Sequence, residues 1–256
     1  MVITKEHLDI EKNHPLNDMQ KGMIFEISRN DYLDPIYIAQ MTFSIKNKLD
    51  IPIFLKAFKE VSKRHDSLRS SIQYDTSEHT YIQHIYKSSK IPTEIFDYQH
   101  MESNEKNEKF NLFLQNDVKN PFSFSIPPLM RLAIFCFDPE DYRIVWTRHH
   151  ILMDGASVQT VLQELFSVYN MILHNNKISL PKAKTILEQD LYHEQLNINY
   201  ASTYWTSKQP YYNEASFLPA ASAKTNLPKR ILSKKFEIFG ERLDDLIKFD
   251  IFVRCC

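Results

Sequence analysis

Apolar side chains recur along this chain at two spacings, which distinguish helices from strands. Side chains three or four residues apart share one face of a helix, whereas alternating side chains share one face of a strand. The first spacing predicts helices over residues 17–27, 51–65, 110–118, 157–174, 186–208 and 243–249. The second, with many β-branched and aromatic side chains, predicts strands over residues 36–45, 70–74, 80–85, 129–137, 143–148 and 231–239.

Polar residues mark where several of these elements begin. Asn17 followed by Gln20 is typical of a helix N-terminus, and Asp50 with Pro52 is typical of another. Residues 102–109 are highly charged, so a loop is expected there, before the helix at residue 110.

Composition and charge exclude several classes of protein. The 256 residues allow one large domain or two modest ones. The 31 basic and 32 acidic side chains nearly cancel, so no global field attracts nucleic acid or an anionic membrane. No uncharged apolar run approaches the ~20 residues that span a bilayer, and the charged N-terminus predicts no secretory signal. Three cysteines offer neither a disulfide framework nor metal-ligand spacing, so a cytoplasmic protein is expected.

The strongest candidate for chemistry is the pair His149 and His150, to which a predicted hairpin around residues 138–141 leads the chain. If the strand continues to residue 150, the two side chains face opposite sides, so one of them can serve a given site. This divergence, with no further ligand cluster nearby, argues against a metal site made of both histidines and Asp154. A protein without catalytic function also fits the pair, with one ring packed and the other solvated.

Asp154 and Gly155 follow at the turn between this strand and the next predicted helix. A short carboxylate there can accept backbone N–H groups or pair with an arginine, so Asp154 is expected to brace the turn. Glycine is scarce in this chain, with 3 residues, where an average usage of about 7% predicts roughly eighteen. Gly155 is therefore expected where a positive φ or a close backbone approach is required, and its N–H can face a developing oxyanion.

Three stretches of the chain, in order, resemble the condensation domains of nonribosomal peptide synthetases, which are related in fold to chloramphenicol acetyltransferase. Residues 15–25 (PLNDMQKGMIF) resemble the family's opening segment, and residues 64–69 (RHDSLR) resemble its RHxxLR segment. The third stretch contains Pro121-Phe122, then Pro128 to Arg131 in a PLxR pattern, and finally the HHILMDG of residues 149–155, which resembles the HHxxxDG signature.

The resemblance implies an α/β fold, an α+β sandwich in which helices pack on a mixed sheet to form a chloramphenicol acetyltransferase-like lobe. Residues 1–180 are expected to form this N-terminal lobe with the HHxxxDG motif. Residues 181–256 are expected to form an inter-lobe helix and the beginning of an incomplete, truncated C-terminal lobe. Between two such lobes the family has a tunnel that receives the phosphopantetheine arms of two carrier proteins.

The implied reaction is the formation of an amide bond between two carrier-bound substrates, an acyl or peptidyl thioester and an aminoacyl amine. The catalytic residues expected are His150 and Gly155, with His149 and Asp154 as structural support of the site and no metal. No cofactor is expected to bind directly, because the phosphopantetheine of the partner carrier proteins holds the substrates. The expected partners are peptidyl or acyl carrier proteins and other synthetase domains, without nucleic acid or membrane.

Other residues of these motifs are expected to be structural. Arg64, His65 and Arg69 lie at a predicted helix end, where cations interact favourably with the helix dipole. Gln20 is expected to cap a helix, and the aromatic pair at residues 204–205, which matches one between the lobes of the family, is expected to pack.

Two other functions stay open at this point. One is a truncated, non-catalytic fragment that binds carriers, and the other is a stand-alone acyltransferase that uses an acyl-CoA donor. Epimerising and cyclising relatives share parts of the same pattern, so the subtype stays open as well, as do the donor and the acceptor.

Overall fold

The structure, a computed structural model, describes residues 9–29, 36–186, 188, 198–209, 236–237 and 250–255. The chain divides into two units, Met1–Ala183 with Lys234–Cys256, and Lys184–Ser233. The first unit carries the sheets and the histidine pair. In the second unit the structure describes the helix α6 (Ile198–Lys208), whose Tyr204 and Trp205 contact each other and are exposed.

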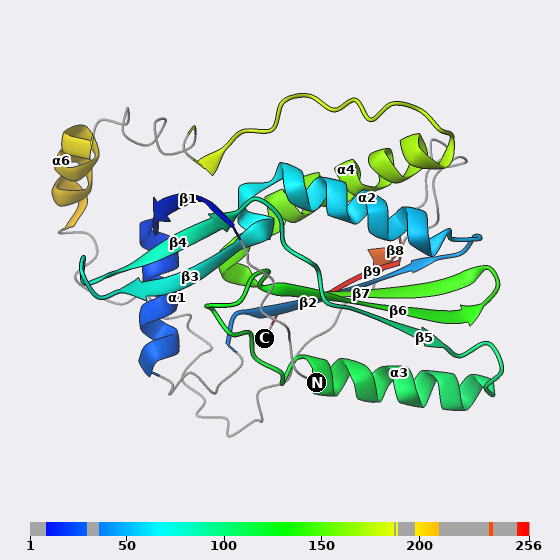
Figure 1. Ribbon diagram of the computed structural model, residues 1–256. Helices are drawn as coiled ribbons and strands as arrows, with labels where there is room; N and C mark the ends of the chain where they lie inside the picture. Colours follow the sequence, from blue (N-terminus) through cyan, green and yellow to red (C-terminus); the bar gives the residue numbers. More distant parts are fainter. Residues whose placement is uncertain are drawn as a thin grey trace, which may run out of the picture. The chain divides into compact units, whose positions relative to one another are not determined.

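A six-stranded mixed sheet forms the centre of the first unit (Figure 1). Its order is β5 (Thr93–Asp97), β6 (Met130–Asp138), β7 (Asp141–His149), β2 (Ile38–Ile45), β9 (Asp250–Cys255) and β8 (Phe236–Glu237). The pair β5 and β6 is parallel, and the other neighbouring pairs are antiparallel. The predicted hairpin is therefore confirmed as β6 and β7.

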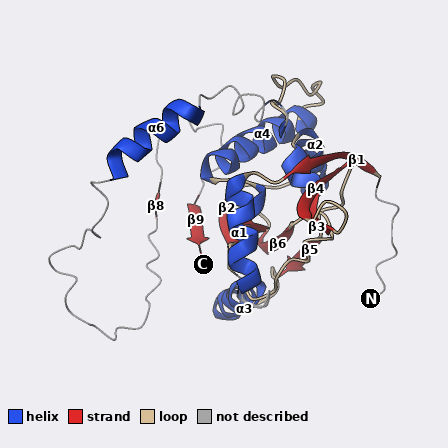
Figure 2. Ribbon diagram, turned by 90° about the vertical axis from the view of Figure 1, so that its left-hand side faces the viewer, coloured by secondary structure: helices blue, strands red, loops and turns tan. Residues whose placement is uncertain are grey.

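Helices cover both faces of this sheet. Helices α2 (Ile51–Arg64) and α4 (Gly155–Leu173) lie on one face, and α3 (Ser103–Asp117) lies on the other (Figures 1 and 2). This layering of helices on a mixed sheet confirms the expected fold class.

The central strands are buried on both faces, so successive residues enter different apolar clusters. On β6, Leu132 and Ile134 join the cluster beneath α2 and α4, whereas Ala133 and Phe135 join the cluster beneath α3. This alternation follows from the two-residue period of a strand. A strand with apolar residues at consecutive positions is typical of such a doubly covered sheet.

A second, three-stranded antiparallel sheet lies in the same unit. Its order is β1 (Ile10–Pro15), β4 (Thr80–Tyr86) and β3 (Ser70–Asp75), and the helix α1 (Asp18–Arg29) follows β1. Ile24 of α1 and Ile72 of β3 belong to the cluster beneath α2 and α4. The small sheet and α1 therefore share the main core.

The start of α2 shows how local sequence places these elements. The carboxylate of Asp50 accepts a hydrogen bond of 2.9 Å from the N–H of Ile53, and Pro52 lies in the first turn, as expected. The helix then buries Phe54, Phe58 and Val61, which lie three or four residues apart and so share the face toward the sheet.

The expectation of a loop over residues 102–109 is wrong, because α3 begins at Ser103. Most of this segment is exposed, so its charges face water and leave no apolar stripe to mark a helix. Its exception is Lys106, which is 7% exposed and whose ammonium donates to the carbonyl of Phe137 at 2.6 Å. Lysine and glutamate are good helix formers, so helix propensity predicts this segment better than the pattern of apolar residues does.

Three described strands were not predicted, namely β1, β5 and β9. β1 has the sequence IEKNHP and is almost entirely exposed, and β5 is a five-residue edge strand. Neither shows a clear alternation of apolar and polar residues, because each owes its position to a partner strand far along the chain. Of the predicted elements near the C-terminus, residues 236–237 form a strand, and residues 243–249 lie outside the described residues.

Candidate active site

The histidine pair lies where β7 ends and the chain turns toward α4. β7 ends at His149, and residues His150–Leu152 form the 3-10 turn η2 before α4 begins at Gly155. The N–H of His149 donates to the carbonyl of Leu129 at 2.9 Å, and the N–H of His150 donates to the carbonyl of Tyr37 at 2.7 Å. The strand therefore ends one residue earlier than supposed, and the backbone of both histidines is held by neighbouring segments.

His149 is enclosed by aromatic rings. It is 3% exposed, and its ring lies edge-on to the rings of Phe124 and Tyr37, with centroids 4.8 and 6.3 Å away. Its Nδ1 accepts a hydrogen bond of 3.1 Å from the N–H of Ile151. A neutral imidazole that accepts at Nδ1 carries its proton at Nε2.

The same surroundings keep His149 neutral near pH 7. Burial, and then the positive charge of a protonated His150, lower the pKa of His149. A hydrogen bond with the backbone of Ile36 raises the pKa, but the net result is a pKa of about 4. A neutral, buried ring that is hydrogen-bonded to the backbone of Ile151 and Ile36 holds the turn in place.

His150 differs from its neighbour in exposure and in bonding. Its side chain is half-buried, and its imidazole makes no hydrogen bond to any other described residue. Its backbone N–H bonds to Tyr37, which has a positive φ of 62°, a conformation uncommon for a bulky side chain. The ring of His150 is thus the member of the pair that can reach a reactant.

Asp154 is exposed and caps α4. Its Oδ1 accepts a hydrogen bond of 2.8 Å from the N–H of Ser157. Hydrogen bonds from the side chain and then from the backbone of Ser157 lower the pKa of Asp154, so the carboxylate is ionised near neutral pH. Of the two kinds of partner expected for Asp154, the structure shows a backbone N–H group, and no arginine pairs with Asp154 among the described residues.

Gly155 is the first residue of α4. The expectation that a positive φ requires a glycine at this position is wrong. Gly155 has no positive φ, and a Cβ added to it would meet no atom within 4 Å. Neither backbone conformation nor crowding within the described residues therefore requires a glycine here. The open space beside it leaves the backbone accessible from outside.

The first motif reaches this turn through Gln20, a contact that the sequence did not reveal. Asn17 and Gln20 form the expected reciprocal cap, with Gln20 N–H to Asn17 Oδ1 at 2.9 Å and Asn17 N–H to Gln20 Oε1 at 3.1 Å. In addition, the Nε2 of Gln20 donates to the carbonyl of Ile151 at 3.2 Å. Gln20 therefore links the start of α1 to the residue that follows His150.

The second motif is structural, as expected, although ion pairs rather than the helix dipole dominate it. Arg69 is 5% exposed and pairs with Asp66 and Glu11, each at 2.5 Å. Arg64 and His65 both contact the carboxylate of Glu164 on α4, at 3.0 and 2.6 Å. These pairs join the C-terminal end of α2 to α4, and join the 3-10 turn Asp66–Arg69 to β1.

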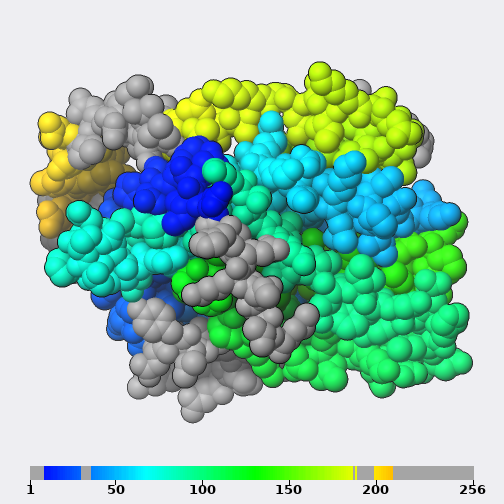
Figure 3. Space-filling model, viewed as in Figure 1, coloured from blue at the N-terminus to red at the C-terminus, as the bar shows by residue number. Residues whose placement is uncertain are grey.

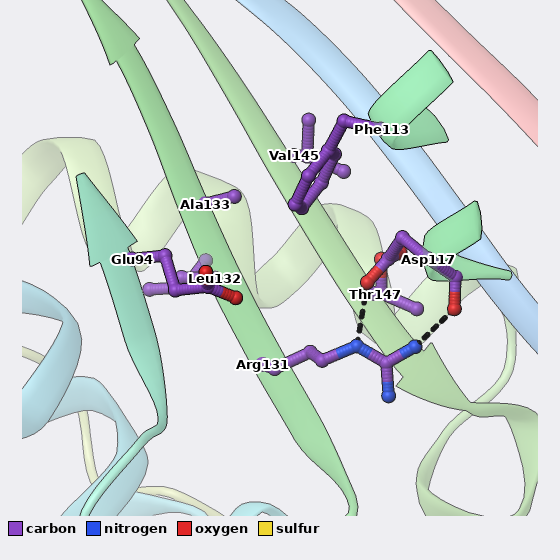
Figure 4. A pocket seen from close by; sticks show the side chains of 8 residues that line it. All are labelled: Glu94, Phe113, Asp117, Arg131, Leu132, Ala133, Val145 and Thr147. Atoms are coloured by element: carbon purple, nitrogen blue, oxygen red, sulfur yellow. Dashed lines mark hydrogen bonds and ion pairs between the residues drawn. The ribbon is translucent and has the colours of Figure 1, made fainter. Parts of the chain in front are cut away.

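The third motif contains a partly buried ion pair that fixes the loop before β6. The Nε of Arg131 donates to Asp117 Oδ1 at 2.6 Å (Figure 4). The guanidinium of Arg131 also lies 4.5 Å from the centroid of the Phe122 ring. Gln40 and Thr147 also donate to the carboxylate of Asp117. The adjoining cavity of about 10 Å³ has room for roughly one water, so this part of the motif is a structural anchor.

A wider hollow lies on the outer side of α2, where the segment after α4 runs along that helix (Figure 3). Its volume is about 430 Å³, and its wall combines apolar and charged side chains, namely Glu60, Val61, Lys63, Arg64, Val168, Ile178 and Leu180. His150 lines neither of these two cavities. Among the described residues, no group of three or more His, Cys, Asp and Glu side chains is placed to hold a metal ion.

The comparison with known families decides what kind of domain this is. The sequence model of the family described as "Condensation domain" matches residues 10–244. The chain belongs to the condensation domain family. The resemblance carried by the three motifs is therefore confirmed.

The curated relatives of this condensation domain are much longer proteins. Bacitracin synthase 1 of Bacillus licheniformis is 32% identical over 212 residues, which cover 82% of this chain and 4% of that protein. Tyrocidine synthase 2 of Brevibacillus parabrevis is 27% identical over 229 residues, which cover 90% of this chain and 6% of that protein. This chain thus spans a few per cent of the length of these synthases.

Solved condensation domains share the fold. The starter condensation domain of rhizomide synthetase RzmA matches with a TM-score of 0.69 and 16% identity, over 80% of this chain and 49% of that one. The first condensation domain of the calcium-dependent antibiotic synthetase, in complex with a substrate analogue, matches with a TM-score of 0.65 and 17% identity, over 77% and 47%. This chain spans about half of each, and the chloramphenicol acetyltransferase-like lobe is confirmed.

Within the described residues, no helix is both long enough and apolar enough to cross a membrane.

Proposed function

We propose that this condensation domain carries the reaction centre for amide-bond formation between two carrier-bound substrates, with His150 at its centre. The observation that supports this role is the difference between the two histidines. His149 is buried and hydrogen-bonded to the backbone of Ile151 and Ile36, whereas the half-buried ring of His150 makes no hydrogen bond to another described residue. A ring that is held by its backbone but open at its nitrogens can contact a reactant.

The proposed reaction joins the α-amine of the acceptor to the thioester carbonyl of the donor. The N–C bond forms, the C–S bond breaks, and the proton lost by the amine passes to the phosphopantetheine thiolate, directly or through His150. An α-amine with an ordinary pKa of about 8 needs little activation once it is deprotonated. His150 therefore orients the amine and accepts part of its proton.

Gly155, Asp154 and His149 have supporting roles in this proposal. The N–H of Gly155 lies at the start of α4 next to open space, where it can donate to the oxyanion that develops on the carbonyl. Asp154 caps the same helix, and His149 holds the turn from the inside.

The carrier proteins and the remaining synthetase domains belong to the proposal as partners. The phosphopantetheine arms of the carriers bring both substrates, so the domain needs no cofactor of its own. We also propose that residues 1–180 form the N-terminal lobe, that residues 181–256 begin the second lobe, and that the domain works in the cytoplasm.

Replacement of His150 tests the proposal. The chain is joined to the second lobe of a condensation domain and assayed for amide formation between two loaded carrier proteins. His150→Ala is expected to lower the rate by about 100- to 10,000-fold, the usual contribution of a positioned histidine. His100→Ala, at an exposed histidine in a turn, is the matched control and is expected to retain the rate. An unchanged rate in His150→Ala removes this residue from the mechanism.

Binding of carriers without turnover is the second candidate, because the chain spans about half of the solved condensation domains that it matches. Titration of the chain with a loaded carrier protein distinguishes the two. Binding with no amide formation, even after the second lobe is supplied, favours this candidate. Amide formation with an acyl-CoA in place of the donor carrier favours instead a stand-alone acyltransferase.

A further inference from the structure

Gln20 uses both ends of its side-chain amide in bonds of different kinds. Its Oε1 accepts the N–H of Asn17 at 3.1 Å and completes the cap of α1. Its Nε2 points the other way, and donates to the carbonyl of Ile151 at 3.2 Å and to Oε1 of Gln83 at 3.3 Å. The capping bond accounts for the oxygen, but it does not account for the two bonds of the nitrogen.

Buried side chains hold the partner of that nitrogen in place. Gln83 on β4 is 2% exposed, and its own Nε2 donates to Oγ of Ser70 at 2.8 Å. Ser70 is 1% exposed, and its hydroxyl donates in turn to the carbonyl of Ser67 at 2.8 Å. Because a buried amide is costly to leave unbonded, this chain of bonds fixes the direction in which Gln20 donates.

The bond to Ile151 acts on the backbone that carries His150. The N–H of His150 is bonded to the carbonyl of Tyr37, and the N–H of Ile151 is bonded to Nδ1 of His149. The Gln20 bond adds the carbonyl of Ile151, so the backbone is held on both sides of His150. Because the backbone at His150 is held, the position of the His150 imidazole depends on its side-chain torsions alone.

We propose that Gln20 is a positioning residue for His150, an inference that rests on the function proposed above. Gln20 lies 131 residues from Ile151 in sequence, and it acts through the turn without contacting the reactants. A displacement of about 1 Å at a reacting group lowers a rate by roughly 100-fold, so a bond of this kind is sufficient to matter.

Two substitutions separate positioning from capping. Gln20→Glu keeps an oxygen for the N–H of Asn17 and removes both donors, so the cap stays and the bond to Ile151 is lost. Gln20→Met removes the donors without adding a charge and covers the case in which the glutamate variant does not fold. Asn17→Ala is the matched control, because it weakens the start of the same helix and leaves the Gln20 donors intact.

The first measurement needs no activity and uses the chain itself. Hydrogen exchange of the Ile151 N–H, followed by NMR, is expected to be about two- to tenfold faster in both Gln20 variants than in Asn17→Ala, as for the loss of one hydrogen bond. Equal exchange in all three variants overturns the proposal, because the turn would then depend on the start of α1 and not on the Gln20 donor.

The second measurement uses the domain completed with its second lobe and two loaded carriers. Both Gln20 variants are expected to lower kcat by about 10- to 100-fold with KM changed less than about twofold, since a displaced histidine affects the transition state rather than carrier binding. A wild-type kcat in the Gln20 variants overturns the positioning role. If the wild-type domain forms no amide, the proposed function has failed, and the exchange measurement then decides whether Gln20 holds the turn.

Discussion

His149 lies between the rings of Phe124 and Tyr37, and this enclosure determines its protonation state. An imidazole that is nearly excluded from water resists a charge, so it accepts from Ile151 and remains neutral. Its neighbour in the sequence is half-buried and keeps its ring open to a reactant. At the scale of residues, the proposed division of roles between the two histidines rests on which ring the surrounding aromatic residues cover.

The neutral His149 predicts a pH dependence of stability. Its pKa is lowered to about 4 in the folded protein, whereas an unfolded histidine has a pKa of about 6.5. Between these values the unfolded state binds a proton that the folded state does not, so stability falls as the pH falls. Lowering the pH from 7 to 5 is expected to remove about 2 kcal/mol through this residue.

Urea unfolding at pH 7 and pH 5 checks this expectation. His149→Gln keeps a polar group that does not titrate, so the part of the pH dependence that belongs to His149 is expected to disappear. His174→Ala, at an exposed histidine that ends α4, serves as the control and keeps the pH dependence of the wild type. Equal pH dependence in His149→Gln and the wild type contradicts the assignment.

The cap at Asp154 makes a second prediction at the scale of single residues. Asp154→Ala is expected to destabilise the protein by about 1 kcal/mol, because the N–H of Ser157 loses its acceptor. Asp154→Asn is expected to remain close to the wild type, since asparagine caps as well as aspartate does. Thermal unfolding of both variants measures the difference. If asparagine is as harmful as alanine, the charge of Asp154 matters more than the cap.

At the scale of elements, the loop between α3 and β6 connects a structural anchor to the histidine turn. Arg131 holds the end of α3 at Asp117 and stacks on Phe122, which lies in the loop. The same loop supplies Phe124, which covers His149, and leads to Leu129, whose carbonyl binds the N–H of His149. The loop part of the third motif therefore supports the histidine turn on the side of His149.

Removing this anchor is expected to be costly. Arg131→Ala leaves the carboxylate of Asp117 buried without its cation, which typically destabilises a protein by about 3–5 kcal/mol. The remaining bonds from Gln40 and Thr147 place the expected loss at the lower end of this range. Urea unfolding compares Arg131→Ala with Lys119→Ala, an exposed cation on the neighbouring turn. Similar stabilities of the two variants contradict the role of the anchor.

At the scale of the whole molecule, the central sheet is assembled from distant parts of the chain. β2 pairs with β7 on one side and with β9 on the other, where Ala39 to Thr42 lie opposite Cys255 to Phe252. In an antiparallel pair, alternate residues of a strand direct their backbone bonds to the same neighbour. Half of the β2 amides in this stretch therefore depend on β9, and half depend on β7.

Deleting residues 250–256 tests this topology. Every second amide between residues 39 and 42 is expected to lose protection from hydrogen exchange, while the amides bonded to β7 remain protected. Exchange measured by NMR resolves the two sets. Unchanged protection of the whole stretch contradicts the pairing with β9, and loss of protection throughout shows instead that the sheet itself has opened.

Some of the fold and of the site follows from residues close together in the chain. The cap of Asn17 and Gln20, the start of α2 at Asp50 and the hairpin before His149 were all predictable, because each depends on bonds or alternation within a few positions. The motifs were sufficient to identify the family, which the family model then confirmed. They also predict that the turn at residues 149–155 carries the chemistry, which stays a prediction.

Contacts between distant segments could not be predicted in this way. β1 and β5 have weak patterns of their own and form because partner strands offer unpaired backbone groups. The enclosure of His149 requires Phe124 and Tyr37, and the donor of Gln20 finds Ile151 after the chain has folded. Local spacing sets which faces are apolar and where helices start, since those depend on neighbouring residues. The enclosure of the His149 ring and the bond to the Ile151 carbonyl depend on packing between elements that are distant in the sequence. Only the tertiary structure brings those elements together.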